Sequence, residues 1–158
     1  NSTTLSLMMK GGLPKGINNL RLGEALLLGR ERSEYKYIEG TTNDAFILEV
    51  ELVECKLKPS LAYGKVGVNS YGQEPALNDY GIKKRGICAV GHQIIDEQTL
   101  WPLDEGIKVI GASSDHLVLD LSDGEKDYKV GDIIQFRLGY FSILRVFNSN
   151  YVNIVYRQ

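Results

Sequence analysis

The sequence contains few of the features that mark metal-binding, membrane-spanning or nucleic-acid-binding proteins. Its 158 residues include only two histidines and two cysteines, without a C-x-x-C or H-E-x-x-H spacing, so we expect no metal site. No apolar run approaches the roughly 18–20 residues needed to cross a bilayer, so we expect no membrane partner. The formal net charge is only -2 and the basic residues are scattered, which argues against a nucleic-acid partner.

The two cysteines, Cys55 and Cys88, lie inside apolar stretches, where a buried free thiol is the usual state. Free thiols are typical of a reducing compartment, so we expect a cytoplasmic location. The chain also begins at Asn1, without methionine, directly on a helix-capping sequence. Because natural amino termini seldom start on a cap, we expect the chain to be part of a longer protein.

The amino-terminal residues carry short α and β patterns joined by glycine and proline. The apolar residues of 4–10 share one face and predict a helix, which the glycines at 11–12 end. Residues 18–23 predict a short strand that runs into a tight turn, and residues 24–28 predict a helical turn or a buried apolar run. The polar segment 30–44 follows, with the composition of a linker.

The residues after 44 show the alternation of a β-rich domain. Leu48, Val50 and Leu52 alternate with Glu49 and Glu51, which predicts a half-buried strand. Further strands are expected at 86–91, 108–111, 116–121, 132–138 and 151–157. Glycine-, aspartate- and asparagine-rich turns separate these short strands, a pattern typical of a twisted barrel or a sandwich. We therefore expect a mainly β protein (α+β overall), whose residues 44–158 form a β-barrel-like carboxy-terminal domain.

The segment from Pro14 to Arg30 contains an Arg-x-Gly arrangement at Arg21 and Gly23. It resembles the end of the barrel in ornithine-racemase-like members of the alanine racemase superfamily, enzymes of fold type III that use pyridoxal 5'-phosphate. The family carries an Asn-Ser pair, then a helix, then Arg-x-Gly on the final strand of a (β/α)8 barrel. The resemblance implies that residues 1–43 are the last helix and strand of this TIM-type barrel plus a linker.

The same resemblance implies a binding place for the cofactor. Asn1 and Ser2 would hold its phosphate together with the backbone amides near Gly23–Glu24, since a helix start offers free N–H groups and a positive dipole end. Arg21 would face the pyridine nitrogen and keep it largely unprotonated, which makes the cofactor a weaker electron sink. From composition alone, Ser2 is a helix cap, Gly23 a turn residue and Arg21 a member of an ion pair.

A second likeness covers residues 107–121, where Ser113-Ser114-Asp115-His116 precedes an apolar strand. This order resembles the β-domain of alanine racemases, and the Ser-Ser-Asp-His form resembles the ornithine-racemase branch. In the family, the residues equivalent to Ser114 and Asp115 reach into the active site of the partner subunit and help to bind substrate. The resemblance thus implies a homodimer with shared sites. Without it, Asp115 would be a turn or cap residue and His116 a surface histidine.

A third likeness lies at Lys84–Gln93, where Gly91-His92 stands at the place of a glycine and a tyrosine in alanine racemases. In the family that tyrosine is the base contributed by the partner subunit. His92 departs from the family pattern here: it would exchange the α-proton in place of the tyrosine, with Asp115 as the other candidate catalytic residue, or it would mark a different substrate or a lost activity. Imidazole suits this role because its usual pKa, near ~6.5, lies close to neutrality. The alternative is a structural histidine, with Tyr63 or Tyr71 as the base.

Tyr140 precedes the apolar stretch 141–147, and the family places a tyrosine that binds the cofactor phosphate at the matching point. A half-buried aromatic on a sheet face is the alternative. The lysine that forms the Schiff base with the cofactor belongs to the first barrel strand and would lie upstream of this chain. We therefore expect the carboxy-terminal portion of a racemase that interconverts L- and D-amino acids, inactive by itself. The alternatives are a non-racemising enzyme of the same superfamily and a non-catalytic β-barrel binding module.

Overall fold

The structure, a computed structural model, describes the chain at residues 2–61, 63–68, 72, 74 and 78–157. The chain divides into two compact units, Asn1–Ile47 and Leu48–Gln158. Within the described ranges, no helix has the length and apolar character needed to span a membrane. The same ranges contain no group of three or more histidine, cysteine or carboxylate side chains arranged to hold a metal ion.

The first unit contains two helices that end at glycines, as the sequence predicts. α1 spans Ser2–Gly11, and α2 spans Glu24–Leu28. Gly29 closes α2 in the left-handed conformation (φ 59°), and its N–H donates to the carbonyl of Ala25 at 3.1 Å. A Cβ at Gly29 would lie 2.1 Å from Oγ1 of Thr41, so the backbone angle and the neighbouring side chain both require glycine there.

The strand predicted at residues 18–23 is wrong. None of these residues belongs to a strand, and the described strands of this unit, β1 (Arg30–Glu31) and β2 (Lys36–Tyr37), pair with each other. A segment becomes a strand when a neighbour takes up its backbone hydrogen bonds, and the described part of this unit offers residues 18–23 no such neighbour. The assignment of residues 1–43 to the end of a TIM-type barrel stays a prediction.

The segment predicted as a linker contains the β1–β2 hairpin. Its turn is held by the buried carboxylate of Glu31, which accepts hydrogen bonds from the N–H and hydroxyl of Ser33 and from the N–H of Glu34. Each strand has only two residues, too few to produce an alternating pattern in the sequence. The hairpin therefore depends on a side-chain contact that composition does not reveal.

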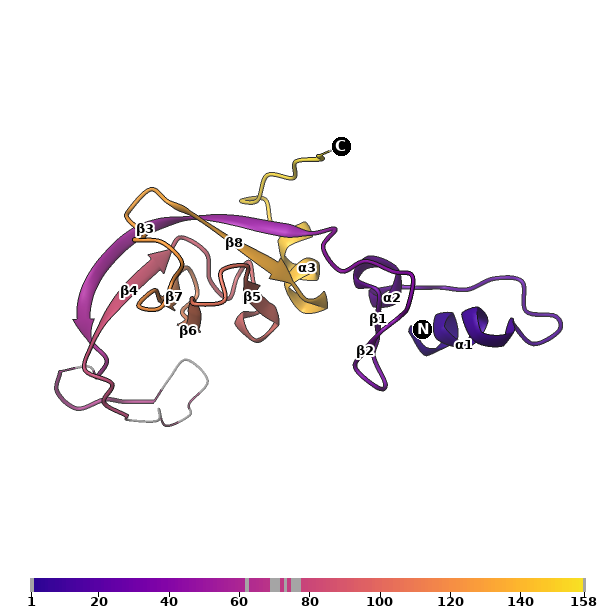
Figure 1. Cartoon of the computed structure of the whole chain (residues 1–158), viewed down its shortest axis with the longest axis horizontal. Helices are drawn as coiled ribbons and strands as arrows, with labels where there is room; N and C mark the ends of the chain where they lie inside the picture. Colours follow the sequence, from indigo (N-terminus) through magenta and orange to yellow (C-terminus); the bar gives the residue numbers. More distant parts are fainter. Residues whose placement is uncertain (1, 62, 69–71, 73, 75–77, 158) are drawn as a thin grey trace. The chain divides into compact units, whose positions relative to one another are not determined.

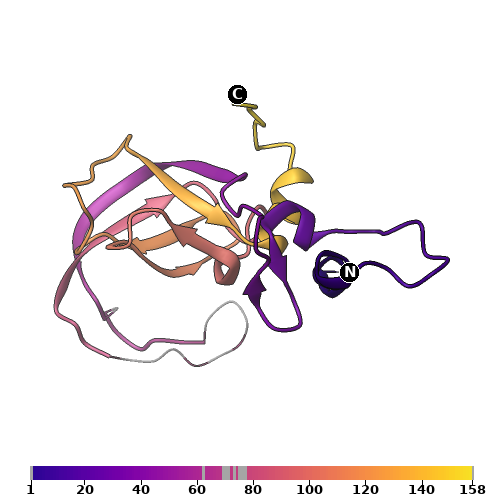
Figure 2. The ribbon, with the colours of Figure 1, turned by 45° about the vertical axis from the view of Figure 1, so that its right-hand side comes forward.

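Six strands form one nearly closed, barrel-like sheet in the second unit (Figures 1 and 2). They are β3 (Ile47–Pro59), β4 (Ile82–Cys88), β5 (Leu100–Pro102), β6 (Lys108–Ala112), β7 (Leu117–Asp120) and β8 (Ile133–Leu138). Their order in the sheet is β5-β8-β3-β4-β7-β6, and the two outer strands contact each other. The contact shields the edges of the sheet, whose backbone groups would otherwise be open to pairing. The predicted β-rich, barrel-like domain is confirmed.

One face of β3 supplies the centre of the core. Leu48, Val50 and Leu52 are buried and alternate with exposed residues, as the period-2 pattern predicts. Buried apolar residues of the other strands join them: Cys88, Leu117, Leu119, Ile134, Phe136 and Leu138. Gly86 of β4 has no side chain, so Leu52 and Leu121 both approach its backbone closely.

Both cysteines are free, as the sequence predicts. Cys88 is fully buried, and the loss of solvent raises the pKa of its thiol to about 12. A thiol with so high a pKa forms almost no thiolate and is therefore unreactive near neutral pH. Cys55 on β3 is only half-buried, and its Sγ donates to the carbonyl of Tyr128 at 3.3 Å.

The carboxy-terminal end departs from the prediction. Residues 151–157 form no strand, and the apolar stretch before them is a helix, α3 (Tyr140–Phe147). This helix buries Ser142, Ile143 and Val146, the spacing of one helix face. Nearly every position of α3 is apolar, so its periodicity does not distinguish a helix from a strand.

The remaining predicted strands are found within a few residues of their expected places. The predictions at 108–111, 116–121 and 132–138 correspond to β6, β7 and β8. The strand predicted at 86–91 begins and ends earlier, as β4. β5 was not predicted, because three residues carry no period.

A buried carboxylate joins two turns of the second unit. Asp104 accepts hydrogen bonds from the hydroxyl of Tyr128 at 2.7 Å and from the N–H groups of Gly106 and Glu125 at 2.8 Å each. Burial alone would raise the pKa of Asp104, but these three hydrogen bonds outweigh it and hold that pKa below its usual range. Burial and the Asp104 carboxylate raise the pKa of Tyr128, so the phenol remains a donor.

Replacing Tyr128 by Phe removes one donor from this carboxylate, and we expect the free energy of unfolding to fall by about 1–2 kcal/mol at neutral pH. Because the folded-state pKa of Asp104 is lowered, its contribution is present above about pH 4 and is lost as the pH falls through the folded value. The deficit of Tyr128→Phe should therefore shrink in acid, as measured by urea unfolding at several pH values. Tyr151→Phe, at an exposed tyrosine, is the control. Equal stability of the two variants at neutral pH would contradict the assigned role.

Candidate functional site

Two connecting segments leave the barrel at the same end. β4 ends at Cys88 and β6 ends at Ala112, and both residues lie opposite Leu117, the first residue of β7. The segment that follows β4 and the turn between β6 and β7 therefore emerge beside each other. The polar residues of two separate sequence motifs are brought together in this way.

The two segments are joined backbone to backbone. The N–H of His92 donates to the carbonyl of Ser113 at 2.9 Å, and the N–H of Gln93 donates to the carbonyl of Ser114 at 3.1 Å. Such bonds fix one segment against the other without using any side chain. The six residues that meet here, Gly91–Gln93 and Ser113–Asp115, are termed the turn cluster.

Gly91 makes this approach possible. A Cβ at this position would lie 2.4 Å from the carbonyl oxygen of Ser113, and 2.5 Å from both the carbonyl oxygen of Ser114 and the N–H nitrogen of Asp115. All three neighbours are backbone atoms, which cannot turn away as a flexible side chain can. Only glycine therefore fits at position 91 without moving the two segments apart.

The turn cluster presents an exposed carboxylate. Ser114 and Asp115 are exposed, and Oδ1 of Asp115 accepts a hydrogen bond from Nε2 of Gln93 at 3.0 Å. The turn is closed from within, because the N–H of His116 donates to Oγ of Ser113 at 3.2 Å. A carboxylate held in one orientation at the surface is suited to bind a cation, such as an ammonium group, from outside.

His92 is more deeply buried than these residues. Its side chain is 17% exposed, its Nε2 is buried, and its Nδ1 lies 2.9 Å from Oε2 of Glu97. Glu97 begins the short 3-10 helix η1 (Glu97–Thr99). From α3, Nη1 of Arg145 donates to the carbonyl of His92 at 3.0 Å and to that of Ile95. A carboxylate against one ring nitrogen fixes the orientation of an imidazole.

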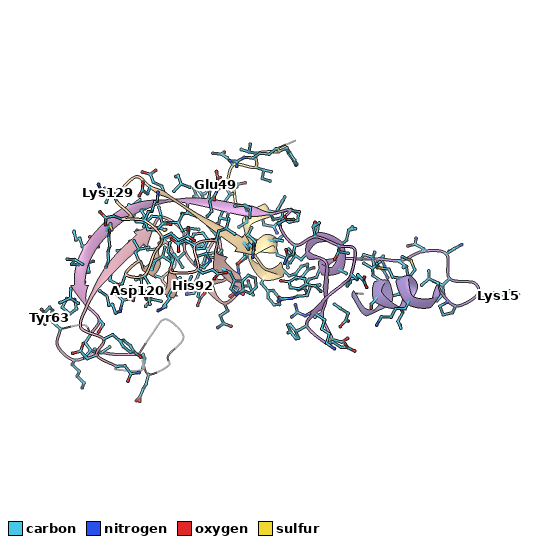
Figure 3. All side chains as sticks on the ribbon, in the orientation of Figure 1. Lys15, Glu49, Tyr63, His92, Asp120 and Lys129 are labelled. Atoms are coloured by element: carbon cyan, nitrogen blue, oxygen red, sulfur yellow. The ribbon has the colours of Figure 1, made fainter. Side chains whose placement is uncertain are left out.

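Tyr63, Tyr71 and Tyr140 are the tyrosines that the sequence offers as site residues. Tyr63 is 91% exposed and lies at the left edge of the second unit, well apart from His92 (Figure 3). Tyr71 lies outside the described residues. Tyr140 is half-buried at the start of α3, with its ring 6.0 Å from that of Phe141 in an edge contact. Its role as a phosphate ligand stays a prediction.

The cofactor-binding residues predicted in the first unit are only partly described. Asn1 and the side chain of Ser2 lie outside the described part, although Ser2 begins α1. Arg21 is exposed on the segment that leads to α2, and Gly23 is the N-cap of α2, with no side chain capping the helix. The carboxylate of Glu24 is buried and accepts a hydrogen bond from Nη1 of Arg32 at 3.0 Å.

Comparison with known proteins finds two racemases. The chain is 49% identical over 152 residues to an ornithine racemase of Acetoanaerobium sticklandii and 43% identical over 156 residues to a lysine racemase of Thermotoga maritima. The chain is homologous to both racemases. The matches cover 96% and 99% of this chain but 43% and 44% of the two relatives, so it spans less than half of their length. No family model matches the chain.

This homology to racemases confirms the resemblance that the motifs indicated. Three residues were nevertheless not assigned from the sequence: Gln93 of the turn cluster, and Glu97 and Arg145 beside it. Gln93 follows His92 directly within one of the motifs, which was a usable signal. Glu97 and Arg145 come from η1 and α3, and only the folded chain brings them to His92.

We expect Gly91→Ala to lower the free energy of unfolding by about 1–3 kcal/mol, because the added methyl group overlaps backbone atoms of the neighbouring turn. Amide hydrogen exchange around His92 should also become faster as the two segments separate. Gly111→Ala is the matched control, since a Cβ there meets no atom within 4 Å, and it should change stability by less than about 0.5 kcal/mol. Chemical denaturation and hydrogen-exchange mass spectrometry measure both effects. A fully stable Gly91→Ala variant would contradict the close approach.

Proposed function

We propose that the full-length protein to which this chain belongs is a pyridoxal 5'-phosphate-dependent racemase that interconverts the L and D forms of a basic amino acid. The observation that carries the proposal is the 49% and 43% identity to an ornithine racemase and a lysine racemase over nearly the whole chain. Ornithine and lysine both have a second amino group, which is a cation at neutral pH. The exposed, oriented carboxylate of Asp115 suits such a substrate.

The first unit supports the proposed cofactor. Gly23, the N-cap of α2, offers no side chain to the helix start, and by the family resemblance the backbone amides near Gly23–Glu24 would hold the cofactor phosphate. Arg32 neutralises the carboxylate of Glu24 next to them, so an incoming anion does not meet an unpaired negative charge. Arg21 precedes this helix start by two residues and would face the pyridine ring. When bound, the cofactor supplies an electron sink that acidifies the α-carbon of the amino acid.

The second unit would act on the substrate through the turn cluster. In the proposed homodimer, the cluster of one subunit faces the amino acid bound in the other, where Ser114 and Asp115 contact it. Racemisation requires removal of the α-proton on one face of the substrate and its return on the other. The cluster contains two titratable groups, His92 and Asp115, of which Asp115 is the exposed one. A cytoplasmic location belongs to the same proposal and agrees with the two free thiols.

The racemase proposal is tested by α-proton exchange in the full-length protein. With L-ornithine or L-lysine in deuterated water, we expect both the D-isomer and deuterium at the α-carbon, because racemisation passes through loss of that proton. Chiral chromatography and NMR measure the two products, and L-alanine, which lacks a second amino group, is the comparison substrate. Cofactor binding without exchange would indicate a non-racemising enzyme of the same superfamily. A protein that binds no cofactor would be a non-catalytic module.

Replacing Asp115 by Asn keeps the shape of the side chain and removes its charge. We expect kcat/KM for ornithine to fall by about tenfold or more, since the cationic substrate loses an ionic partner. Glu105→Gln, at an exposed carboxylate of another turn, is the matched control. Steady-state kinetics of the full-length variants gives the comparison. An unchanged kcat/KM in Asp115→Asn would contradict a role in binding the substrate.

A further inference from the structure

His92 is placed differently from the exposed residues of the turn cluster. Ser114 and Asp115 are exposed, whereas the side chain of His92 is only 17% exposed. Its Nε2 is buried, and its Nδ1 faces Oε2 of Glu97 at 2.9 Å. A group that takes a proton from a substrate has to reach it at about hydrogen-bond distance. The carboxylate of Asp115 is open to a molecule from outside, whereas Nε2 of His92 is buried and its Nδ1 faces Glu97.

Glu97 approaches His92 from an anchored segment. Oγ of Ser142, fully buried on α3, donates to the carbonyl of Asp96 at 2.9 Å and accepts from the N–H of Asp96 at 3.1 Å. Oγ1 of Thr99 donates to the carboxylate of Asp96 at 3.0 Å. The short helix that carries Glu97 is thus fixed at both of its ends, and its carboxylate has a defined place beside the imidazole.

The backbone of His92 links this support to the exposed turn. Its N–H donates to the carbonyl of Ser113, and its own carbonyl accepts a hydrogen bond from Arg145. The next residue, Gln93, orients the carboxylate of Asp115. A shift of the imidazole away from its place would therefore disturb both the backbone pairing and the orientation of Asp115.

We infer that His92 and Glu97 are positioning residues, which hold the turn cluster so that Asp115 is the group of this domain that contacts the substrate. The inference rests on the proposed racemase function, because it assigns roles within that site. It differs from the role of base that the family resemblance implies for His92. The two roles make opposite predictions for one conservative substitution.

His92→Asn in the full-length holoenzyme separates the two roles. Asparagine carries an amide nitrogen near the position of Nδ1, so it still reaches Glu97, but it has no titratable group. A positioning role predicts that α-proton exchange of both D- and L-ornithine stays within about threefold of wild type. Selective loss of exchange for one enantiomer, with the fold intact, would identify His92 as the base and overturn the inference.

A second measurement does not depend on catalysis. Hydrogen exchange of the peptide covering residues 91–95 should become about tenfold faster in His92→Ala and in Glu97→Ala, and should remain near wild type in His92→Asn. The double alanine variant should show little further change, because both residues act through one contact. Unchanged exchange in His92→Ala would overturn the positioning role. Absence of racemase activity in the wild-type protein would instead overturn the proposed function and leave this readout intact.

His116→Asn is the matched control for both measurements. It makes the same substitution at the other histidine, which is exposed on the neighbouring turn and contributes its backbone N–H and carbonyl to the turn. We expect wild-type exchange of substrate and of amide protons. A change in His116→Asn as large as in His92→Ala would show that the effect is not specific to the Glu97 contact, and would overturn the inference.

Discussion

The close contact between Gly91 and the backbone of residues 113–115 is the constraint on which the polar end of this domain depends. The pairing of β4 and β6 with β7 brings the two connecting segments to one place, and the missing side chain lets their backbones bond. At this end of the domain Asp115 is exposed, whereas the side chain of His92 is only 17% exposed. Two backbone hydrogen bonds join the segments, and one side-chain hydrogen bond from Gln93 orients the exposed carboxylate of Asp115.

The sequence predicted those parts of the fold in which burial leaves a period. β3 was predicted because Leu48, Val50 and Leu52 face the core while their neighbours face solvent. α3 and the β1–β2 hairpin were missed, because one is apolar on nearly all sides and the other is too short for any pattern. The strands predicted at 18–23 and 151–157 were wrong, since strand formation depends on a partner and not on local composition alone.

The candidate site, like the fold, was predicted only in part from the sequence. The motifs that contain His92 and Asp115 stood out by resemblance, and the fold brings the two segments together. No pattern along the chain indicates that Glu97 faces the imidazole, because that contact depends on how η1 is anchored to α3 through Ser142. Burial also bears on how a motif is interpreted. A histidine at the position of a family's catalytic residue can have a positioning role when its ring is buried.

A structure of the full-length protein with cofactor and ornithine bound would test these assignments most directly. We predict the carboxylate of Asp115 at hydrogen-bond distance from the bound amino acid, with Nδ1 of His92 still against Glu97. An imidazole turned toward the α-carbon of the substrate would contradict the positioning role. A turn cluster that faces away from the bound amino acid would contradict the whole assignment of this site.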